Sequence, residues 1–534
     1  MNFLIQSTTV NYKINHKIAL CLKELYPGSR FGVMISSHGD NIKSLKTQNE
    51  MNYEYIYDTS NIEEIFLKED YSWEELHEFE ETIPEKSLWR FIAMDRIWGR
   101  AFCKGASKYF DRRTVSNGGV NQENALKIAC GYIRYFKKIL SDLDANVVLF
   151  HPGLHSMKSP ILEQCCKNMN VLYLALIGSR VGNYYSISPN KHQTFPHIEE
   201  TYKEIVGNEI DVDLIPGAEC YDEVLGSAEG KGYSYHHKLV RKLLSGLSEQ
   251  KKAPTSYVNL FVKSLAWSIV SWFKVRRDKK SRGFDTGQYD FKYLLFNLYY
   301  NLVLAYQRKK LLRDSFYDEY EPNVKYLYYP LTGQPEYSTQ VMDNMWINQL
   351  TIIEALAKSV PFDWKIYVKE HPGTIGWRVR PFSFYREIRQ YPNVKLIPIN
   401  LESPQIVRNA QMVVAISSTV AWEAVLFHNK PVITFSKTLY NVTGLASRCS
   451  DITELSRLIH EECQRIEAIS AEERRRRIVA LFSAILLHSI WINDPVAALS
   501  DIDSEGYPEA ELERNARAIA NTIKKYVNEY GFLS

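Results

Sequence analysis

Between residues 324 and 435, short apolar runs alternate with helical segments, and this pattern constrains the fold more than any other feature of the chain. The runs are Val324–Pro330, Trp364–Lys369, Val394–Ile397 and Met412–Ile416, and they favour β-branched and aromatic residues as strands do. Strands that alternate with helices predict a parallel sheet with helices on both faces. The sequence therefore predicts a doubly wound α/β domain here.

The first part of the chain shows the same alternation. Strands are expected at Phe3–Gln6, Phe31–Ser36, Asn146–Phe150 and Val171–Leu176, with helices near Lys13–Leu25 and Ser159–Met169. A chain of 534 residues is too long for one hydrophobic core, so we expect two large domains.

The predicted boundaries follow from these patterns. They give an N-terminal Rossmann-like domain (1–232), a helical insertion or linker (233–321), a C-terminal Rossmann-like domain (322–490) and a terminal helix that packs back on the first domain (491–534). The insertion joins aromatic-rich amphipathic segments, Val258–Val275 and Tyr293–Leu312, to basic runs. It is interpreted as a helical insertion with a solvated basic rim, and docking to a membrane surface is the alternative. The Arg474–Arg477 run is expected to be a solvated helix face.

Composition excludes several classes of protein. A net charge of +3 gives no overall footprint for nucleic-acid binding. The eight cysteines form no CxxC pair, which argues against a zinc site and for a reducing compartment. We find no signal peptide and no apolar run long enough to span a membrane, so a cytoplasmic location is expected.

Four polar turns follow the four runs of the second half. They are Gln334–Glu336, Lys369–Pro372, Pro398–Asn400 and Ser417–Thr419. Ligands of open α/β sheets bind outside the carboxyl ends of the strands, where these turns would meet. The sequence predicts one shared ligand site at this edge.

The Ser417-Ser418-Thr419 turn opens a predicted helix. The first N–H groups of a helix lack internal partners and carry part of a positive charge, so hydroxyls beside them make an anion site. Simple N-capping is the alternative for each hydroxyl. Glu423, one turn into the helix, can accept hydrogen bonds from the hydroxyls of a ribose.

His371 follows a predicted strand end and can donate a proton or a hydrogen bond to a phosphate. Lys369, Arg378 and Arg380 lie near it in the sequence and predict a positive cluster that suits a leaving phosphate without a metal. The Glu336 carboxylate can bond a sugar hydroxyl, hold the nucleotide or orient His371. A proline-stiffened turn is the alternative for that tripeptide.

These segments resemble a known family. Tyr328–Pro330, Gln334–Glu336, Tyr367–Pro372, Ala415–Ala424 and Lys430–Phe435 are similar to the capsular polysaccharide biosynthesis and export family, which includes retaining Kdo transferases. Its members carry Gln-Pro-Glu and His-Pro motifs, both present here. This chain has Ser-Ser-Thr where members often have Ser-Gly-Thr. Fainter similarity occurs at Ser87–Arg90 with Asp95-Arg96, and at Ser179–Asn183.

The resemblance implies a GT-B fold, with two Rossmann-like domains facing a cleft. The helical insertion and the C-terminal helices are expected from the sequence pattern, and the insertion has no recognised counterpart in the family. It implies a glycosyltransferase that moves an ulosonic acid, Kdo or a nonulosonic acid such as sialic or pseudaminic acid, from a CMP-sugar to a surface polysaccharide or glycolipid. Retention of configuration, no metal and no other cofactor are expected. The N-terminal domain would supply the acceptor side and the C-terminal domain the nucleotide-sugar site. Peripheral contact with the inner membrane is expected only from the alternative interpretation of the basic, aromatic insertion.

The expected site residues fall into three groups. Catalytic candidates are His371, Glu336 and, as a carboxylate nucleophile beside several arginines, Asp95. Ion pairing within a helix is the alternative for Asp95. Nucleotide-binding candidates are Gln334, Lys369, Pro372, Ile399, Ser417, Ser418, Thr419 and Glu423, and the donor carboxylate or the acceptor would meet Arg96, Arg180 and Asn183.

Two kinds of alternative remain open. One is another enzyme on the same fold, either a polyol-phosphate transferase or a nucleotide-sugar epimerase. The other is a non-catalytic scaffold of capsule assembly that binds polymer or membrane through residues 233–321.

Overall fold

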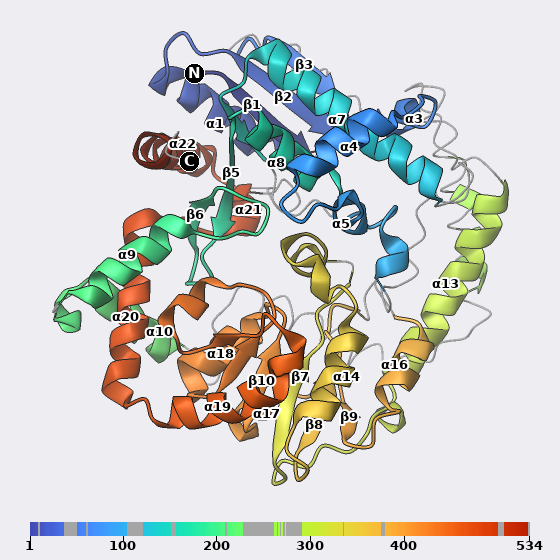
Figure 1. Ribbon diagram of the computed structural model, residues 1–534, viewed down its shortest axis with the longest axis vertical. Coiled ribbons are helices and arrows are strands. Elements are labelled where there is room, and N and C mark those ends of the chain that lie inside the picture. The colour runs from blue at the N-terminus through green and yellow to red at the C-terminus, as the bar shows by residue number, and fades with distance from the viewer. Residues whose placement is uncertain are drawn as a thin grey trace. The chain divides into compact units, whose positions relative to one another are not determined.

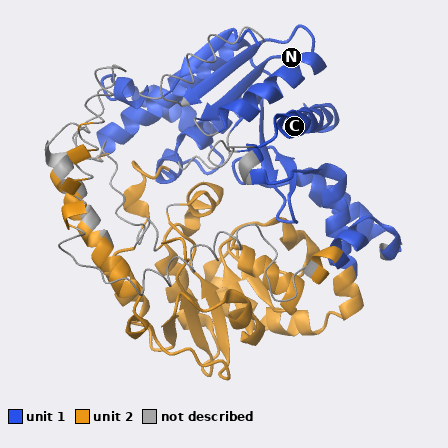
Figure 2. Ribbon diagram, turned by 180° about the vertical axis from the view of Figure 1, so that it is seen from behind, with its two compact units in different colours: residues 1–94, 122–222, 476–534 blue, residues 95–121, 223–475 orange. Residues whose placement is uncertain are grey.

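The computed structural model describes residues 1–8, 11–36, 51–59, 62–103, 121–150, 156–208, 211–227, 261–263, 265–266, 269–270, 273, 291–334, 336–374, 380–499 and 507–531. Most of the expected helix Val258–Val275, and also Pro335 and Arg378, lie outside these ranges. The chain forms two compact units (Figure 2). Unit 1 contains residues 1–94, 122–222 and 476–534, and unit 2 contains residues 95–121 and 223–475.

Unit 1 contains a seven-stranded sheet in the order β13-β6-β5-β4-β1-β2-β3 (Figure 1). Its strands are β1 (Phe3–Thr8), β2 (Phe31–Ser36), β3 (Tyr55–Asp58), β4 (Val147–Leu149), β5 (Leu172–Gly178), β6 (Tyr184–Ser188) and β13 (Ile490–Trp491). The strands from β3 to β5 are parallel, and β6 and β13 add antiparallel pairs. The parallel order β3-β2-β1-β4-β5 is that of a Rossmann sheet, and it reverses between β1 and β4.

Helices surround this sheet. They are α1 (Tyr12–Leu25), α3 (Ile62–Phe66), α4 (Trp73–Thr82), α5 (Leu88–Ala93), α7 (Gln122–Leu143), α8 (Lys158–Asn168), α9 (Pro196–Gly207), η2 (Val212–Leu214), α21 (Pro495–Leu499) and α22 (Glu509–Tyr530). Ile18 of α1 and Ile519 of α22 lie in one apolar cluster with Phe3 of β1. Lys17 of α1 also pairs with Glu513 of α22 at 3.1 Å. The terminal helix therefore packs against α1 and completes the core of unit 1 (Figure 1).

Unit 2 contains a six-stranded parallel sheet in the order β12-β11-β10-β7-β8-β9. Its strands are β7 (Tyr326–Pro330), β8 (Lys365–Lys369), β9 (Val394–Ile397), β10 (Met412–Ala415), β11 (Val432–Thr434) and β12 (Ser447–Arg448). Counted from β7, this is the Rossmann order 3-2-1-4-5-6. The predicted fold class, two Rossmann-like α/β domains of the GT-B type, is confirmed in the sheet topology of each unit.

The side chains of β7 alternate between the two faces of this sheet, as strand geometry requires. Leu327 and Tyr329 enter the main apolar cluster, whereas the Tyr326 hydroxyl on the other face donates to the carbonyl of Ile406 at 2.6 Å. The helical elements of unit 2 are η1 (Arg100–Phe102), α13 (Phe291–Leu311), η4 (Asp314–Phe316), η5 (Ser338–Met342), η6 (Asn344–Trp346), α14 (Gln349–Ser359), α16 (Phe382–Ile388), α17 (Ser403–Asn409), α18 (Thr419–His428), η7 (Leu439–Thr443), η8 (Ile452–Glu454) and α19 (Leu455–Glu467).

The compact units differ from the expected boundaries at three places. Helix α10 (Gly217–Ser227) and helix α20 (Ala471–His488) each cross from one unit to the other, and residues 95–121 belong to unit 2. The second half of α20 joins unit 1 because Phe482 stacks edge-on to Tyr221 and Ser483 Oγ accepts a hydrogen bond from the Gly217 amide at 2.9 Å. The expected solvated face is wrong for Arg474, whose side chain is buried near the start of α20.

Candidate functional site

The predicted polar turns lie at one edge of the unit 2 sheet. Strands β7 and β10 are neighbours at the point where the strand order reverses, and β8 lies beside β7. Residues 331–336 follow β7, residues 370–373 follow β8, residues 398–400 follow β9 and residues 416–418 follow β10. The prediction that the four turns share the carboxyl edge is therefore confirmed, and this edge is where open α/β sheets bind ligands.

His371 is exposed at this edge, and its ring has a defined orientation. Its Nδ1 accepts a hydrogen bond from the Gly373 amide at 3.1 Å. The neutral ring therefore carries its proton on Nε2, because Nδ1 must supply a lone pair. Gly373 leaves little room beside the ring, since a Cβ there would lie 3.1 Å from Nδ1. The loop thus holds His371 as an Nε2–H donor.

Glu336 and His371 lie next to each other around Gly333. A Cβ placed on Gly333 would be 3.5 Å from His371 Nδ1 and 3.9 Å from Glu336 Oε2. Glu336 and His371 are 35 positions apart in the sequence. The Gln-Pro-Glu and His-Pro motifs therefore bring a carboxylate and an imidazole to one place in the fold. Such a pair can bind a polar substrate group, and the carboxylate can stabilise a protonated imidazole.

A buried ion pair underlies these two motifs. Arg380 and Glu370 are fully buried, and Arg380 Nε donates to Glu370 Oε2 at 2.8 Å. Burial by itself would lower the pKa of Arg380, but the Glu370 carboxylate and neighbouring groups raise it by more. The pKa of Arg380 is therefore above its usual value, and the guanidinium stays charged. The expectation that Arg380 belongs to a phosphate-facing cluster is wrong, because its side chain points into the protein rather than toward the edge.

Gln334 is also part of this buried layer. Its Oε1 accepts from Arg380 Nη1 at 3.1 Å, and its Nε2 donates to the carbonyl of Ile347 at 2.5 Å. The side chain is fully buried, with both ends of its amide in use. A contact between this motif and a nucleotide would therefore use Glu336 or the backbone rather than the Gln334 amide.

Lys369, the last residue of β8, is buried on the other face of the sheet. Its Nζ donates to Ser403 Oγ at 3.1 Å, and this hydroxyl lies 3.4 Å from Tyr328 Oη. Burial lowers the pKa of Lys369 to about 8, although Glu402 acts in the opposite direction. An anion bound nearby would restore the full positive charge of this group.

The hydroxyl turn opens α18 as predicted. Ser418 is the N-cap residue, and its Oγ accepts from the Val420 amide at 3.1 Å, so the capping alternative holds for this hydroxyl. Ser417 is buried and Thr419 is partly exposed. The Ala421 amide also bonds the Ser418 carbonyl, at 3.2 Å. The positive end of this ten-residue helix lies at the same sheet edge. Glu423 lies one turn further on and is largely buried.

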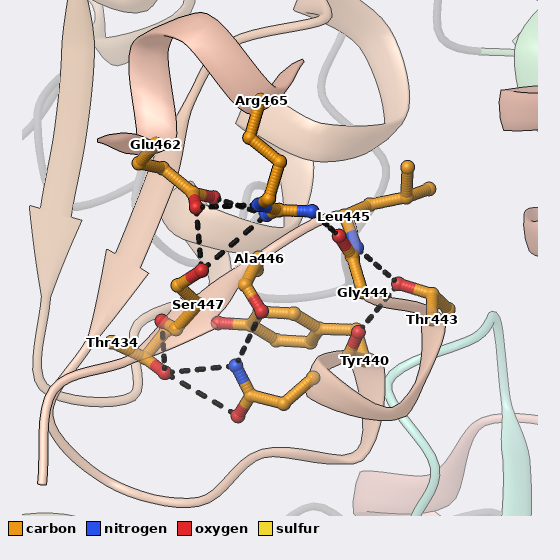
Figure 3. A network of polar contacts seen from close by, with 10 residues as sticks. Thr434, Tyr440, Thr443, Gly444, Leu445, Ala446, Ser447, Glu462 and Arg465 are labelled. Atoms are coloured by element: carbon orange, nitrogen blue, oxygen red, sulfur yellow. Dashed lines mark hydrogen bonds and ion pairs between the residues drawn. The ribbon is translucent and has the colours of Figure 1, made fainter. Parts of the chain in front are cut away.

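Helix α18 is held by a stacked ring pair. Trp422 stacks on Tyr440 with ring centroids 5.0 Å apart, and Tyr440 belongs to the turn after β11. Figure 3 shows the polar network that fixes this turn. Arg465 bonds Glu462 at 2.6 Å and also reaches the carbonyl of Gly444, and the Glu462 carboxylate accepts from Ser447 Oγ at 2.5 Å. These contacts anchor the helix whose start faces the candidate site.

The loop after β9 presents a mixed surface. The Ile399 side chain lies in the apolar cluster of unit 2, whereas Asn400 is exposed. Any nucleotide contact at Ile399 would therefore use its backbone. Pro372, beside His371, is partly exposed.

Asp95 and Arg96 lie just after α5 and belong to unit 2. Asp95 Oδ1 accepts from the amides of Ile97 at 2.8 Å and Trp98 at 3.1 Å, and the side chain is only 2% exposed. A carboxylate in this position caps a turn. Arg96 is exposed. The catalytic role expected for Asp95 stays a prediction, with this structural role beside it.

Arg180 and Asn183 lie in the tight loop between β5 and β6 in unit 1. Arg180 adopts a φ of +64°, which is uncommon for a residue with a side chain. The Asn183 carbonyl accepts from the Ile492 amide at 3.1 Å, which ties this loop to the strand β13 region. The loop follows the carboxyl end of β5, as expected for a residue that meets a ligand.

Sequence reasoning missed Gly333, Glu370 and Ser403. Gly333 has a signal, since a glycine directly before Gln-Pro-Glu can leave room for a neighbouring side chain. No such signal exists for Glu370 and Ser403, because their roles depend on partners from other elements. Among the described residues, no group of three or more His, Cys, Asp or Glu side chains is placed to hold a metal ion.

Part of the chain matches a known protein family. Residues 304–458 match the sequence model of the family described as "Capsule polysaccharide biosynthesis protein". A comparison with curated proteins finds no match. The matched segment contains the whole sheet edge from Gly333 to Glu423.

Several solved structures are similar at low identity. The UDP-GlcNAc 2-epimerase from Neisseria meningitidis bound to UDP-GlcNAc is 12% identical, covers 91% of this chain and 98% of its own, and has a TM-score of 0.24. KpsC of Thermosulfurimonas dismutans, a β-Kdo 2,4 transferase, is 13% identical over 70% of this chain and 87% of its own, with a TM-score of 0.29. The glycosyltransferase of kitacinnamycin is 11% identical over 98% of both chains, with a TM-score of 0.24.

The site geometry and the family match concern the same residues. The match contains the Gln-Pro-Glu motif, the His-Pro motif and the hydroxyl turn on which the sequence resemblance was based. Over residues 304–458, this chain therefore matches the sequence model of the capsule polysaccharide biosynthesis family.

Proposed function

We propose that this protein is a CMP-sugar-dependent glycosyltransferase of capsule synthesis. It would move an ulosonic acid, Kdo or a nonulosonic acid such as sialic or pseudaminic acid, to a surface polysaccharide or glycolipid, with retention of configuration. The observation that carries the proposal is the position of His371. The Nδ1 side of its ring and the Glu336 carboxylate adjoin Gly333 at the strand-order reversal of a Rossmann sheet, and its Nε2 carries the proton.

The phosphate of the nucleotide would lie at the start of α18. The positive end of the helix and the Ser417 and Thr419 hydroxyls favour an anion there. His371 would donate its Nε2 proton to an oxygen of the departing CMP phosphate, and a neighbouring carboxylate at Glu336 would stabilise the charged ring. No step of this proposal uses a metal ion, and we propose that the reaction is metal-independent.

The ribose and the buried cation complete the proposed nucleotide site. Glu423, one turn into α18, would accept hydrogen bonds from the ribose hydroxyls. A bound phosphate would raise the pKa of Lys369, which burial lowers to about 8 in the free protein. The choice of cytidine as the base is supported by the family resemblance rather than by a contact.

Calorimetric titration with CMP, CDP, UDP and GDP in EDTA tests this proposal. We expect selective CMP binding, which is lost in His371→Ala and kept in His460→Ala. His460 is an exposed histidine of α19 in the same unit and serves as the matched control. A preference for UDP would favour a nucleotide-sugar epimerase, and a preference for CDP a polyol-phosphate transferase. Absence of all binding would favour a capsule-assembly scaffold.

Contact with the cytoplasmic face of the membrane is a second part of the proposal. Leu295, Tyr299 and Tyr306 of α13 are exposed and recur at helical spacing along one face, and the last turn carries Arg308, Lys309 and Lys310. Apolar and basic side chains side by side suit an anionic lipid surface. None of the helices that the structure describes is long and apolar enough to cross a membrane.

Vesicle co-sedimentation tests this contact. We expect binding to vesicles that contain anionic lipid, weakened by a Tyr299→Ser and Leu295→Ser double variant. Equal binding to neutral vesicles, or no effect of the double variant, would contradict it.

A further inference from the structure

We propose that Arg380 is a positioning residue that locks the loop after β7 to the loop after β8, and so sets the relation between Glu336 and His371. This inference rests on the proposed function, since it concerns the same two side chains. It adds a residue that is remote from the edge and that touches neither the nucleotide nor the sugar.

The guanidinium of Arg380 reaches both loops at once. Its Nε bonds Glu370 Oε2 at 2.8 Å in the loop after β8. Its Nη1 bonds Gln334 Oε1 at 3.1 Å, and its Nη2 bonds the carbonyl of Thr332, both in the loop after β7. The donors of a guanidinium lie in one rigid plane, so the three contacts fix the two loops relative to each other.

Glu370 passes this constraint to His371 directly. Its Oε1 accepts from the His371 amide at 2.7 Å, while its Oε2 also accepts from the Tyr385 hydroxyl at 2.8 Å. The pKa of Tyr385 is raised well above its usual value by burial and by the Glu370 charge, so the hydroxyl remains a donor. The backbone of the His-Pro motif is thus bonded to the same carboxylate that holds Arg380.

The loop after β7 is fixed from its other side as well. Gln349 of α14 accepts from the Thr332 amide and donates to the Thr332 carbonyl, at 2.9 Å in both cases. Gln334 Nε2 donates to the carbonyl of Ile347. Glu336 follows this fixed segment by two residues. The geometry therefore makes Gln334 a second positioning residue, with its amide used inside the protein.

The arrangement requires the shape of arginine and not only its charge. Lysine would keep the pairing with Glu370 but cannot reach three acceptors in one plane. The guanidinium also lies over the Phe384 ring at 4.8 Å, which helps to hold its plane. Arg380→Lys therefore removes the fork while it keeps a buried cation beside Glu370.

Arg389 offers a matched control in the same unit. It bonds Asp318 at 3.4 Å and the carbonyl of Phe316, and lies over the Phe316 ring at 5.0 Å. These contacts resemble those of Arg380, but they join no motif loop. Arg389→Lys reports the general cost of replacing an arginine that is stacked and ion-paired.

The experiment compares Arg380→Lys, Arg389→Lys and the unaltered protein by two readouts. The first is the imidazole ¹⁵N spectrum, in which His371 is assigned from its absence in His371→Ala. We expect the Nε2–H form of His371 in the unaltered protein and in Arg389→Lys, and a mixture of tautomers in Arg380→Lys. The second is turnover of a CMP-sugar, scaled to the number of CMP-binding sites so that unfolded molecules do not count.

We expect the kcat of Arg380→Lys to fall about 100-fold, with KM for the donor changed less than about 3-fold, because a displaced His371 affects the transition state more than binding. A normal His371 spectrum together with normal kcat would overturn the proposal. If Arg380→Lys does not fold, Gln334→Met removes the Nη1 acceptor at similar volume and should give the same pattern more weakly. Absence of turnover in the unaltered protein would defeat the proposed function, whereas the spectra would still test the positioning role.

Discussion

The two sheets share the Rossmann strand order but carry different groups at their carboxyl edges. In unit 2, His371 and Glu336 stand on a layer of buried side chains that bond one another, with Arg380 at the centre. In unit 1, the predicted residues Arg180 and Asn183 lie in a tight loop after β5, which is held by the Ser179 hydroxyl and by the bond from the Ile492 amide to the Asn183 carbonyl. The comparison teaches that a shared topology provides a place for a site, and that buried polar support decides where side chains are preset for chemistry.

The largest expected effect separates two of the catalytic candidates of unit 2, His371 and Asp95. His371→Ala should lower the kcat for a CMP-sugar by about 1000-fold, within the range that a general acid contributes. Asp95→Asn should leave kcat within about 2-fold, because an amide oxygen can still accept from the Ile97 and Trp98 amides as in a capping role. Steady-state turnover of the purified variants measures both effects. A loss in Asp95→Asn equal to that of His371→Ala would restore Asp95 as the nucleophile.

Lys369 should make the stability of unit 2 increase with pH in the alkaline range. Its pKa is about 8 in the folded protein and about 10.5 when unfolded, so the unfolded chain binds more protons between these values. Stability should therefore rise as pH increases from 8 to 10.5, with a total gain of about 3 kcal/mol from this group. Urea unfolding of the protein and of Lys369→Met across this range measures the difference. A parallel pH dependence in the two proteins would count against a depressed lysine pKa.

His197 should make unit 1 sensitive to acid instead. Burial, aided by His488 and Lys525, lowers the pKa of His197 to about 3, and its Nε2 lies 3.1 Å from Ser186 Oγ. The unfolded chain binds more protons between about pH 3 and 6.5, so stability falls as pH drops through this window. We expect a loss of about 2 kcal/mol at pH 5 relative to pH 7, reduced in His197→Gln. Acid unfolding followed by circular dichroism measures how the stability of the protein and of His197→Gln depends on pH. The same pH dependence in both would contradict this assignment.

Ser418→Ala should give the smallest effect. Loss of the N-cap acceptor for the Val420 amide should destabilise unit 2 by about 1 kcal/mol. CMP affinity should weaken only a few-fold if the helix amides, rather than this hydroxyl, hold the phosphate. Thermal unfolding and calorimetry of Ser418→Ala and Ser418→Asn separate the two roles, since asparagine restores a cap. A loss of CMP binding in both variants would assign the phosphate contact to the hydroxyl itself.

Local patterns predicted much of the fold. The runs at Val324–Pro330 and Trp364–Lys369 became β7 and β8 with boundaries shifted by one or two residues, because a buried parallel strand needs a continuous apolar segment. The capping role of Ser418 and the start of α18 also follow from neighbouring residues alone. The antiparallel strands β6 and β13 were not predicted, since their pairing joins segments about 300 residues apart.

The sequence by itself determined two Rossmann-like domains and the place of the motifs at one sheet edge, because strand and helix periodicity and turn chemistry act over a few residues. Only the tertiary structure decided that Arg380 and Gln334 are buried and that Gly333 separates Glu336 from His371. Charged side chains in a sequence predict exposure, since a lone buried charge is unfavourable. A buried one is stable only when partners from distant elements surround it, as Glu370, Gln334 and the Thr332 carbonyl do here.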